Sequence, residues 1–390
     1  MPALTNLQYF EFDSTQQTLV SDLQDKITAS ASWTKINSAA ALVPITVTIA
    51  AGAVTLTAAS GAWATAGIGI GSVIRIGVKG AADCEYRTVT ATTATTVTIA
   101  ATTYAHNSGT NVYDGHEVFK ATTTRGADMI VDLMDAHTVV TNQFLNMAVY
   151  KAHTGAMGGG TDRSGRWLYW RATAAVAASN VIHCIVSVSK EHLFISLEGP
   201  RFSETNPESA TLGSARNYFF IGDVVPYFVG DTIPCAFAGG QMVAAAAASF
   251  PTSLFGGVSR DAANANSWVQ ARLQTPCTPQ NGGPTAAFNV QRLATGDGNW
   301  YLDPYKVVED VAGERGRLAN FFFAGYVNPD YPDGVVPAPP LGSKVTYSSQ
   351  NYKILVMNKT GTSISTYSQF GANVNASNNG VGIAVAVPCT

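Results

Sequence analysis

The stretch between Ala41 and Thr110 constrains the fold of this chain most, because it alternates branched apolar residues with threonine. In the runs Ile45–Ile49 and Val54–Thr57, every second residue is a threonine. A period of two is typical of a strand that buries one of its faces. The pattern therefore predicts half-buried β-strands here.

Three further runs in the same segment have the composition of strands. Val73–Gly77 follows turn glycines, and a Thr/Ala turn joins Tyr86–Thr90 to Thr96–Ile99. Five or six strands in about seventy residues indicate a small antiparallel barrel or sandwich. We expect residues 41–110 to form a small β-domain of this kind.

The segments on either side of residues 41–110 belong together as one interrupted domain. Ser32–Ile36 precedes the module and His116–Thr122 follows it, and both have strand-like sequences. A compact unit is well tolerated at a loop tip. We therefore expect residues 1–40 plus 111–390 to form a β-rich body, with a division into two subdomains near residues 200–215 as an alternative.

The body contains many further runs enriched in aromatic and β-branched residues, which predict strands. Phe144–Tyr150 fits either a strand or a helix, and Val381–Val387 predicts a last strand that pairs within its own chain or, at a sheet edge, with a neighbouring subunit. The expected fold class is mainly β, with a β-sandwich or jelly-roll-like body. The other predicted strands are Met129–Leu133, Trp167–Arg171, Ile182–Val186, Leu193–Leu197, Tyr218–Gly222, Arg317–Tyr326 and Tyr352–Val356.

One amphipathic helix is predicted near the start of the chain, over Thr15–Ala29. Leu19, Leu23 and Ile27 recur every four residues and define one apolar face. Ser14 and Gln17 have the spacing of a capping box, which favours a helix that begins at this point.

A shortage of charge limits the possible functions. Asp, Glu, Lys and Arg make up 13% of the residues, against about 25% in typical proteins. Low net charge (-3) and 46% apolar residues exclude a disordered chain. Because 23 basic residues face 26 acidic ones, we do not expect nucleic-acid binding as a main activity. The surface must be neutral and polar, and such side chains are less costly to desolvate when subunits associate.

The sequence gives no sign of export or of membrane insertion. The first twelve residues lack the basic and apolar regions of a signal peptide, so we expect synthesis in a cytoplasm. Cys235–Phe250 is too short and too weakly apolar to span a bilayer, and we expect no membrane anchor. The five scattered cysteines, at positions 84, 184, 235, 277 and 389, are expected to be free thiols in the core.

Motifs that could carry chemistry have simpler structural interpretations. Gly155–Asp162 lacks the lysine of a phosphate-binding loop and is expected to be a flexible loop, although Arg163 and Arg166 nearby could bind an anion. Gly296–Asn299 and Asn328–Gly334 do not match a calcium loop and are expected to be turns.

The histidines and aromatic residues define no catalytic or metal site by their spacing. His106, His116, His137, His153, His183 and His192 include no helical metal pair, and His183 is expected to be a hydrogen-bonded core residue. Trp167, Tyr169 and Trp170 favour core packing, with a sugar-stacking platform as the alternative. We therefore predict no catalytic residue, cofactor or metal.

The inserted segment resembles small β-domains of structural proteins from tailed bacteriophages. The resemblance is carried by Gly67–Ile76, a glycine-flanked strand, and by Tyr86–Ile99, a threonine-rich hairpin. The sequence departs from the family at Lys79–Glu85, where Gly-Ala-Ala-Asp-Cys replaces an Asn-rich turn.

The body is similar to phage virion proteins in four short elements. These elements are turns and strands: Ser32–Lys35, Phe219–Asp223, Pro226–Asp231 and Tyr352–Leu355. The resemblance implies a structural virion component of the tail, neck, collar or baseplate. It would be localised in the virion and would contact copies of itself in a symmetric ring and other virion proteins, without catalysis.

Three segments are candidate bridges between subunits: the predicted helix Thr15–Ala29, the proline-rich arm Asn328–Gly342 and the C-terminal strand. Two alternatives remain open. One is a receptor- or glycan-binding module of a fibre or spike, which would need exposed aromatic residues. The other is a hydrolase of cell-wall glycans with two carboxylates that meet only in the fold.

Overall fold

The fold of the computed structural model is mainly β, with 55% of residues in strands and 7% in helices, which confirms the predicted class. The structure describes residues 4–15, 18–37, 40–135, 143–163, 167–170, 181–198, 216–228, 234–240, 256–260, 268–274, 300–309, 313–326, 344–356 and 384–390.

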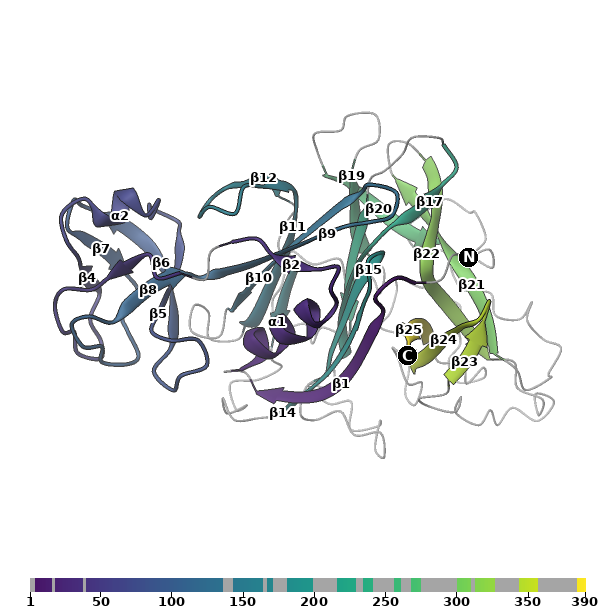
Figure 1. The fold of residues 1–390 in the computed structure, drawn as a ribbon, viewed down its shortest axis with the longest axis horizontal. Helices are drawn as coiled ribbons and strands as arrows, with labels where there is room; N and C mark the ends of the chain where they lie inside the picture. The colour runs from purple at the N-terminus through teal and green to yellow at the C-terminus, as the bar shows by residue number, and fades with distance from the viewer. Residues whose placement is uncertain are drawn as a thin grey trace, which may run out of the picture. The chain divides into compact units, whose positions relative to one another are not determined.

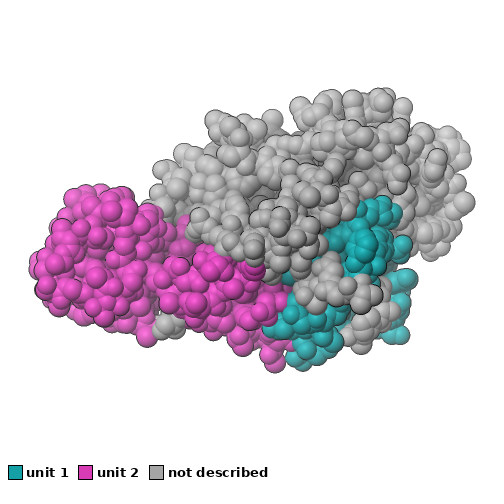
Figure 2. Space-filling model, turned by 90° about the horizontal axis from the view of Figure 1, so that it is seen from above, with its two compact units in different colours: residues 1–12, 122–127, 183–390 teal, residues 13–121, 128–182 magenta. Residues whose placement is uncertain are grey.

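The chain divides into two compact units, which Figure 2 shows in teal and magenta. Unit 1 comprises residues 1–12, 122–127 and 183–390, and unit 2 comprises residues 13–121 and 128–182. We describe each unit by itself. The expected separate domain at residues 41–110 stays a prediction, although these residues hold most of a sheet of their own.

The first sheet of unit 2 is a small barrel. Its strand order is β3-β8-β5-β6-β7-β4, and a hydrogen bond of 2.8 Å from the Thr46 amide to the Thr57 carbonyl oxygen joins its two ends. Trp63 lies in the core, where its indole N–H donates to Thr95 O at 3.1 Å. The elements are β3 (Val43–Pro44), β4 (Thr55–Thr57), α2 (Ala62–Thr65), β5 (Val73–Ile76), β6 (Glu85–Thr92), β7 (Thr96–Ile99) and β8 (Asn111–Asp114).

The strands predicted for residues 41–110 are confirmed as β4, β5, β6 and β7, except at Ile45–Ile49. The amides of Ile45 and Ile49 donate to the stretch 106–110, at Thr110 and His106, whereas the amide of Thr46 donates to Thr57 of β4. Because the segment changes partner along its length, it forms no continuous ladder, and only an isolated bridge remains at Ile49. Ile45 and Ile49 are buried and Val47 is half exposed, so the alternation indicates a partly buried face and not a paired strand.

The second sheet of unit 2 carries the helix. Its order is β12-β11-β10-β9-β2, and β13 also pairs with β11. Helix α1 (Leu19–Ala29) packs against β10. The ambiguous segment around Phe144 is a strand, β11. The strands are β2 (Thr34–Lys35), β9 (His116–Thr122), β10 (Asp128–Asp135), β11 (Gln143–His153), β12 (Gly160–Arg163) and β13 (Trp167–Trp170).

Helix α1 confirms the predicted apolar face but corrects its start. Leu19, Leu23 and Ile27 are buried, whereas the helix begins at Leu19 and not at Thr15. The expected capping role of Ser14 was wrong, because Ser14 lies in β1 (Gln8–Thr15) and its hydroxyl donates to Asp22 Oδ2 at 2.6 Å.

Unit 1 is built around a long antiparallel sheet with the order β1-β14-β15-β16-β18-β19-β20-β21-β22-β25-β24-β23 (Figure 1). Most neighbours in the sheet are also neighbours in sequence, as in a meander. The strands after β1 are β14 (Val181–Val188), β15 (His192–Glu198), β16 (Arg216–Gly222), β17 (Val224–Pro226), β18 (Cys235–Gly240), β19 (Gly256–Arg260), β20 (Trp268–Gln274), β21 (Trp300–Glu309), β22 (Gly313–Tyr326), β23 (Lys344–Tyr347), β24 (Gln350–Val356) and β25 (Ala384–Cys389).

This sheet curls because β16 continues past Asp223 into β17, which pairs with β22. The curl brings distant strands together around one core. The Ser187 hydroxyl of β14 donates to Pro388 O of β25 at 2.7 Å, and Glu11 of β1 forms an ion pair of 3.1 Å with Lys353 of β24. The shared core contains Ile185, Phe194, Phe220, Val224, Cys235, Phe237, Val307, Leu318, Phe321, Leu355, Val385 and Val387.

The C-terminal strand β25 lies between β22 and β24 and is not at an edge of the sheet. The prediction that it pairs within its own chain is therefore confirmed. Since both of its sides are already paired, β25 has no free edge for a neighbouring subunit. The proline-rich segment Asn328–Gly342 lies outside the described residues.

Candidate functional site: a neutral surface and the charge clusters behind it

The surface of residues 41–110 carries almost no exposed charge. This segment contains five charged residues, and all 70 of its residues are described. Arg75, Glu85 and Arg87 are buried, and Lys79 is mostly buried, with 16% of its side chain exposed. Asp83 is thus the single fully exposed charged residue of the segment. The remaining surface consists mainly of Thr, Ala, Gly and Ser.

Two of these charges neutralise each other inside the barrel. Glu85 and Arg87 lie two residues apart on β6, so they share a face, and they form an ion pair of 2.5 Å. The other carboxylate oxygen of Glu85 lies 2.6 Å from His106 Nε2, and the Thr103 amide donates to Glu85 at 2.8 Å. Burial lowers the pKa of the Arg87 guanidinium. The network satisfies Glu85 without presenting its charge to solvent.

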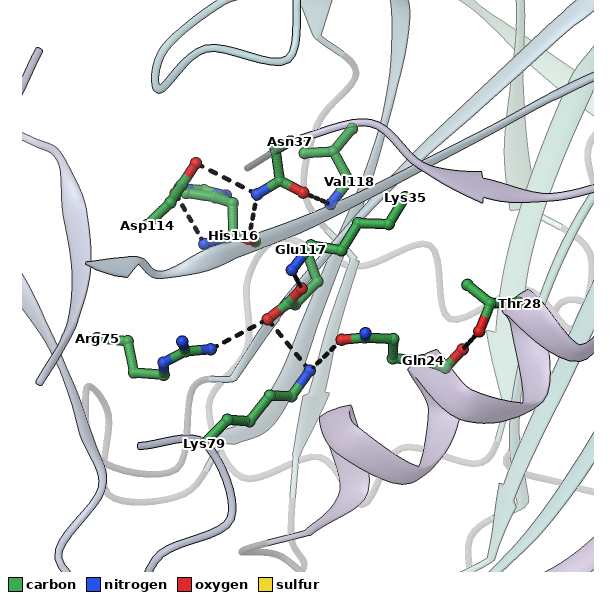
Figure 3. Close-up of polar contacts among 10 residues, drawn as sticks. All are labelled: Gln24, Thr28, Lys35, Asn37, Arg75, Lys79, Asp114, His116, Glu117 and Val118. Carbon is green, nitrogen blue, oxygen red and sulfur yellow. Dashed lines mark hydrogen bonds and ion pairs between the residues drawn. The ribbon is translucent and has the colours of Figure 1, made fainter. Parts of the chain in front are cut away.

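The other two basic residues of the segment meet Glu117, on β9 (Figure 3). Arg75 Nη1 lies 3.3 Å and Lys79 Nζ 3.1 Å from Glu117 Oε1. Lys35 of β2 forms an ion pair with Glu117 Oε2. The carboxylate itself is 1% exposed. A single buried acid therefore faces three cations of unit 2, one from β2 and two from β5 and the loop that follows it.

A neighbouring network of polar side chains surrounds Asp132 on β10. His116 Nδ1 lies 2.8 Å from Asp132 Oδ2, and the Tyr150 hydroxyl donates to the same oxygen at 3.3 Å. Asn37 donates to Asp114 Oδ2 at 3.3 Å and to the backbone oxygen of His116 at 2.6 Å (Figure 3). These bonds fix the positions of both aspartates, as expected for buried carboxylates.

His153 belongs to the same region, and burial lowers its pKa, while the carboxylates of Asp132 and Asp114 act in the opposite direction. Within the described ranges, no group of three or more His, Cys, Asp or Glu side chains could hold a metal ion. The arrangement is that of a buried hydrogen-bond network.

Unit 1 has its own buried acid at the point where β16 gives way to β17. Arg125 Nη1 lies 3.4 Å from Asp223 Oδ1 and also donates to the Val224 carbonyl oxygen. The neighbouring Thr124 amide donates to Glu191 at 3.2 Å. Burial raises the pKa of Asp223 to about 6, although the Arg125 charge opposes this shift. These contacts hold residues 122–127 within unit 1.

Several predicted features lie where the sequence suggested. Of the expected loop Gly155–Asp162, residues 155–159 connect β11 to β12 and are closed by a 3.0 Å bond from Thr154 N to Gly159 O, whereas the expectation was wrong for Gly160–Asp162, which belong to β12. Cys84, Cys184, Cys235 and Cys389 are free and buried, as expected. His183 is only half-buried in β14, so its expected place in the core was wrong.

Other predicted features lie outside the described residues. These are Arg166, His137, Cys277, Gly296–Asn299 and Asn328–Gly334, together with the side chains of Asp162, Arg163, Trp167, Tyr169 and Trp170. The sugar-stacking alternative therefore stays a prediction. In the described part of the chain, no helix is long and apolar enough to cross a membrane.

Sequence reasoning missed the charge clusters, because their members are far apart in the chain. Lys35 and Glu117 are separated by the whole barrel, and His106 reaches Glu85 only through the closure of the barrel. The one local signal was the spacing of Glu85 and Arg87 within a strand, which places both on the same face.

Comparison of the chain with protein-family models, with curated proteins and with solved structures found no match.

Proposed function

We propose that this chain is a structural component of a tailed-bacteriophage virion, of the tail, neck, collar or baseplate, and acts by assembling with copies of itself. The observation that carries the proposal is the neutral surface of residues 41–110, with Asp83 as its single fully exposed charge. The sequence resemblance of the same segment to virion β-domains supports the choice of particle.

The physical argument concerns the cost of desolvation. A charged group loses much of its hydration when an interface covers it, whereas a hydroxyl or a methyl group loses little. Interfaces are depleted of charge in their cores for this reason. Burial of Arg75, Glu85 and Arg87 has therefore left a surface that is inexpensive to cover. In a closed symmetric ring, every copy would contribute this surface to the contact with a neighbouring copy.

The test of the virion role is a direct search for the protein in particles. Tailed particles produced by the host strain that carries this gene would be purified on a density gradient and analysed by quantitative mass spectrometry. We expect peptides of this chain at several copies per particle, co-sedimenting with the other virion proteins. Absence from intact particles, while the protein accumulates in the lysate, contradicts the proposal.

Assembly is tested separately on purified full-length protein. Native mass spectrometry and negative-stain microscopy should show a discrete homo-oligomer of ring shape. A strictly monomeric protein at high concentration argues against assembly. Saturable binding on a glycan array, lost on Trp167→Ala or Trp170→Ala, would instead support the receptor-binding alternative.

A further inference from the structure

The cluster around Glu117 carries more positive charge than its one carboxylate can balance. Lys35, Arg75 and Lys79 each contact Glu117, so the formal charge of the group is about +2 at neutral pH. All four side chains are largely buried, with 15%, 8% and 16% exposed for the three cations. An uncompensated charge in such a place is costly.

Among the described residues, Glu117 is the acid that forms ion pairs with Lys35, Arg75 and Lys79. The charges with the largest effect on Lys79 are those of Glu117, Lys35 and Arg75, and among the described residues its ammonium group also contacts the neutral Gln24 Oε1, at 2.5 Å. Burial and the two neighbouring cations lower the pKa of Lys79, while Glu117 raises it. Arg75 stacks on the ring of Tyr113, at 4.3 Å, which adds no negative charge.

The cluster also has unused hydrogen-bond donors. An ammonium group has three donors and a guanidinium has five. Arg75 uses one donor on Glu117, and its buried Nε has no partner. The ammonium group of Lys35 has three N–H donors and contacts Glu117. Both lysine side chains are partly exposed, so the cluster is in contact with solvent at its edge.

We propose that Lys35, Arg75 and Lys79 bind a doubly charged oxyanion of the phosphate type. A phosphate group carries close to two negative charges at neutral pH and offers several acceptor oxygens, so it matches both the excess charge and the spare donors. A carboxylate would balance only half of the excess. The bound anion joins β5 and the loop after it to β2, and so fixes the barrel sheet to the second sheet of unit 2. This inference is independent of the proposed function.

The experiment uses full-length protein and inorganic phosphate as the probe. Thermal unfolding and isothermal titration calorimetry are measured at constant ionic strength, with chloride as the monovalent comparison and sulfate as a second divalent oxyanion. We expect phosphate and sulfate to raise the Tm in a saturable way, by about 2–4 °C at ten times the Kd. Chloride should leave it unchanged. An equal effect of chloride overturns the proposal, because it indicates ionic strength alone.

Three variants test the position of the site. Lys35→Met and Lys79→Met should each weaken phosphate binding at least tenfold, and the matched control Lys344→Met, outside the cluster, should leave it unchanged. Glu117→Gln should bind phosphate more tightly than the wild type, because it removes the competing carboxylate. Unchanged phosphate affinity in both Lys35→Met and Lys79→Met overturns the proposal. If Glu117→Gln fails to fold, the two lysine variants and the wild-type titration still decide whether phosphate binds at this cluster.

Discussion

His192 on β15 shows how hydrogen bonds determine the state of a single buried side chain. Its Nε2 lies 2.9 Å from the Ser187 hydroxyl and its Nδ1 lies 2.9 Å from the Ser189 hydroxyl. Because Ser187 donates its one proton to Pro388 O, it accepts from His192 Nε2–H. Nδ1 is then the acceptor from Ser189. The neutral ring satisfies both nitrogens of His192, and protonation would turn Nδ1 into a donor, so that Ser189 could no longer donate to it.

This arrangement predicts the pH dependence of stability. Burial lowers the pKa of His192 to about 3, whereas the unfolded chain takes up the proton near pH 6.5. Between these values the unfolded state binds more protons, so this residue should lower the free energy of unfolding as the pH falls, by about 1.4 kcal/mol per pH unit. Above pH 6.5 it has no such effect.

The measurement is urea unfolding of wild type and His192→Gln at several pH values between about 3.5 and 8. This range begins about half a pH unit above the pKa of His192 in the folded state and ends well above its pKa in the unfolded state. The variant should be less stable at pH 8, because it disrupts the serine contacts. Its stability should fall less steeply than that of the wild type below pH 6.5. Parallel curves in that range would show that His192 is protonated equally in both states.

At the scale of elements, the curl of the long sheet depends on one close approach of two backbones. Gly316 on β22 pairs with Pro226 on β17. A Cβ at Gly316 would meet the carbonyl oxygen of Val225 at less than contact distance, and would lie 2.8 Å from Pro226 Cα. These are backbone atoms, which cannot move aside as a flexible side chain can. Only glycine therefore permits the β17–β22 pairing.

We expect Gly316→Ala to lower the free energy of unfolding by about 1–3 kcal/mol, as overpacking of a tight site does. The matched control is Gly69→Ala, because a Cβ at Gly69 has no atom within 4 Å. Urea denaturation of the two variants and the wild type provides the comparison. Equal midpoints for Gly316→Ala and Gly69→Ala would mean that β17 and β22 do not approach as closely as described.

At the scale of the whole molecule, the distribution of charge matters more than its amount. The low charge of the sequence left open whether the few charged residues of the barrel segment were exposed. The structure buries Arg75, Glu85 and Arg87. The surface of the barrel therefore carries fewer charged side chains than the composition of the segment would suggest. Two of the candidate bridges between subunits are less available for such a contact than the barrel surface. Helix α1 buries its apolar face, and strand β25 is paired on both sides. Of these candidates, the barrel surface is therefore the one that fits the contact between copies proposed above.

Charges placed on this surface should therefore prevent assembly without harming the fold. Thr55 on β4 and Thr92 on β6 are both exposed. The double variant Thr55→Lys, Thr92→Lys should weaken self-association at least tenfold, measured by sedimentation velocity over a concentration series. Its Tm should match that of the control Thr55→Gln, Thr92→Gln, which adds bulk without charge. Unaltered association of the lysine variant would place the contact elsewhere.

The sequence by itself determined the local elements, because strand and helix periods are properties of neighbouring residues. Alternation at Val54–Thr57 predicted β4, and the apolar spacing of Leu19, Leu23 and Ile27 predicted the buried face of α1. The start of α1 was missed because β1 extends through Ser14, and pairing of β1 with β14 is a contact between distant residues.

Tertiary structure alone decided which charges meet and where the long sheet bends. Glu117 gathers cations from residues 35, 75 and 79, and β17 leaves the line of β16 to pair with β22 about ninety residues later. Such contacts arise when strands far apart in the chain are brought together by a common core. Periodicity reports which face of an element is buried, and it contains no information on which other element covers that face.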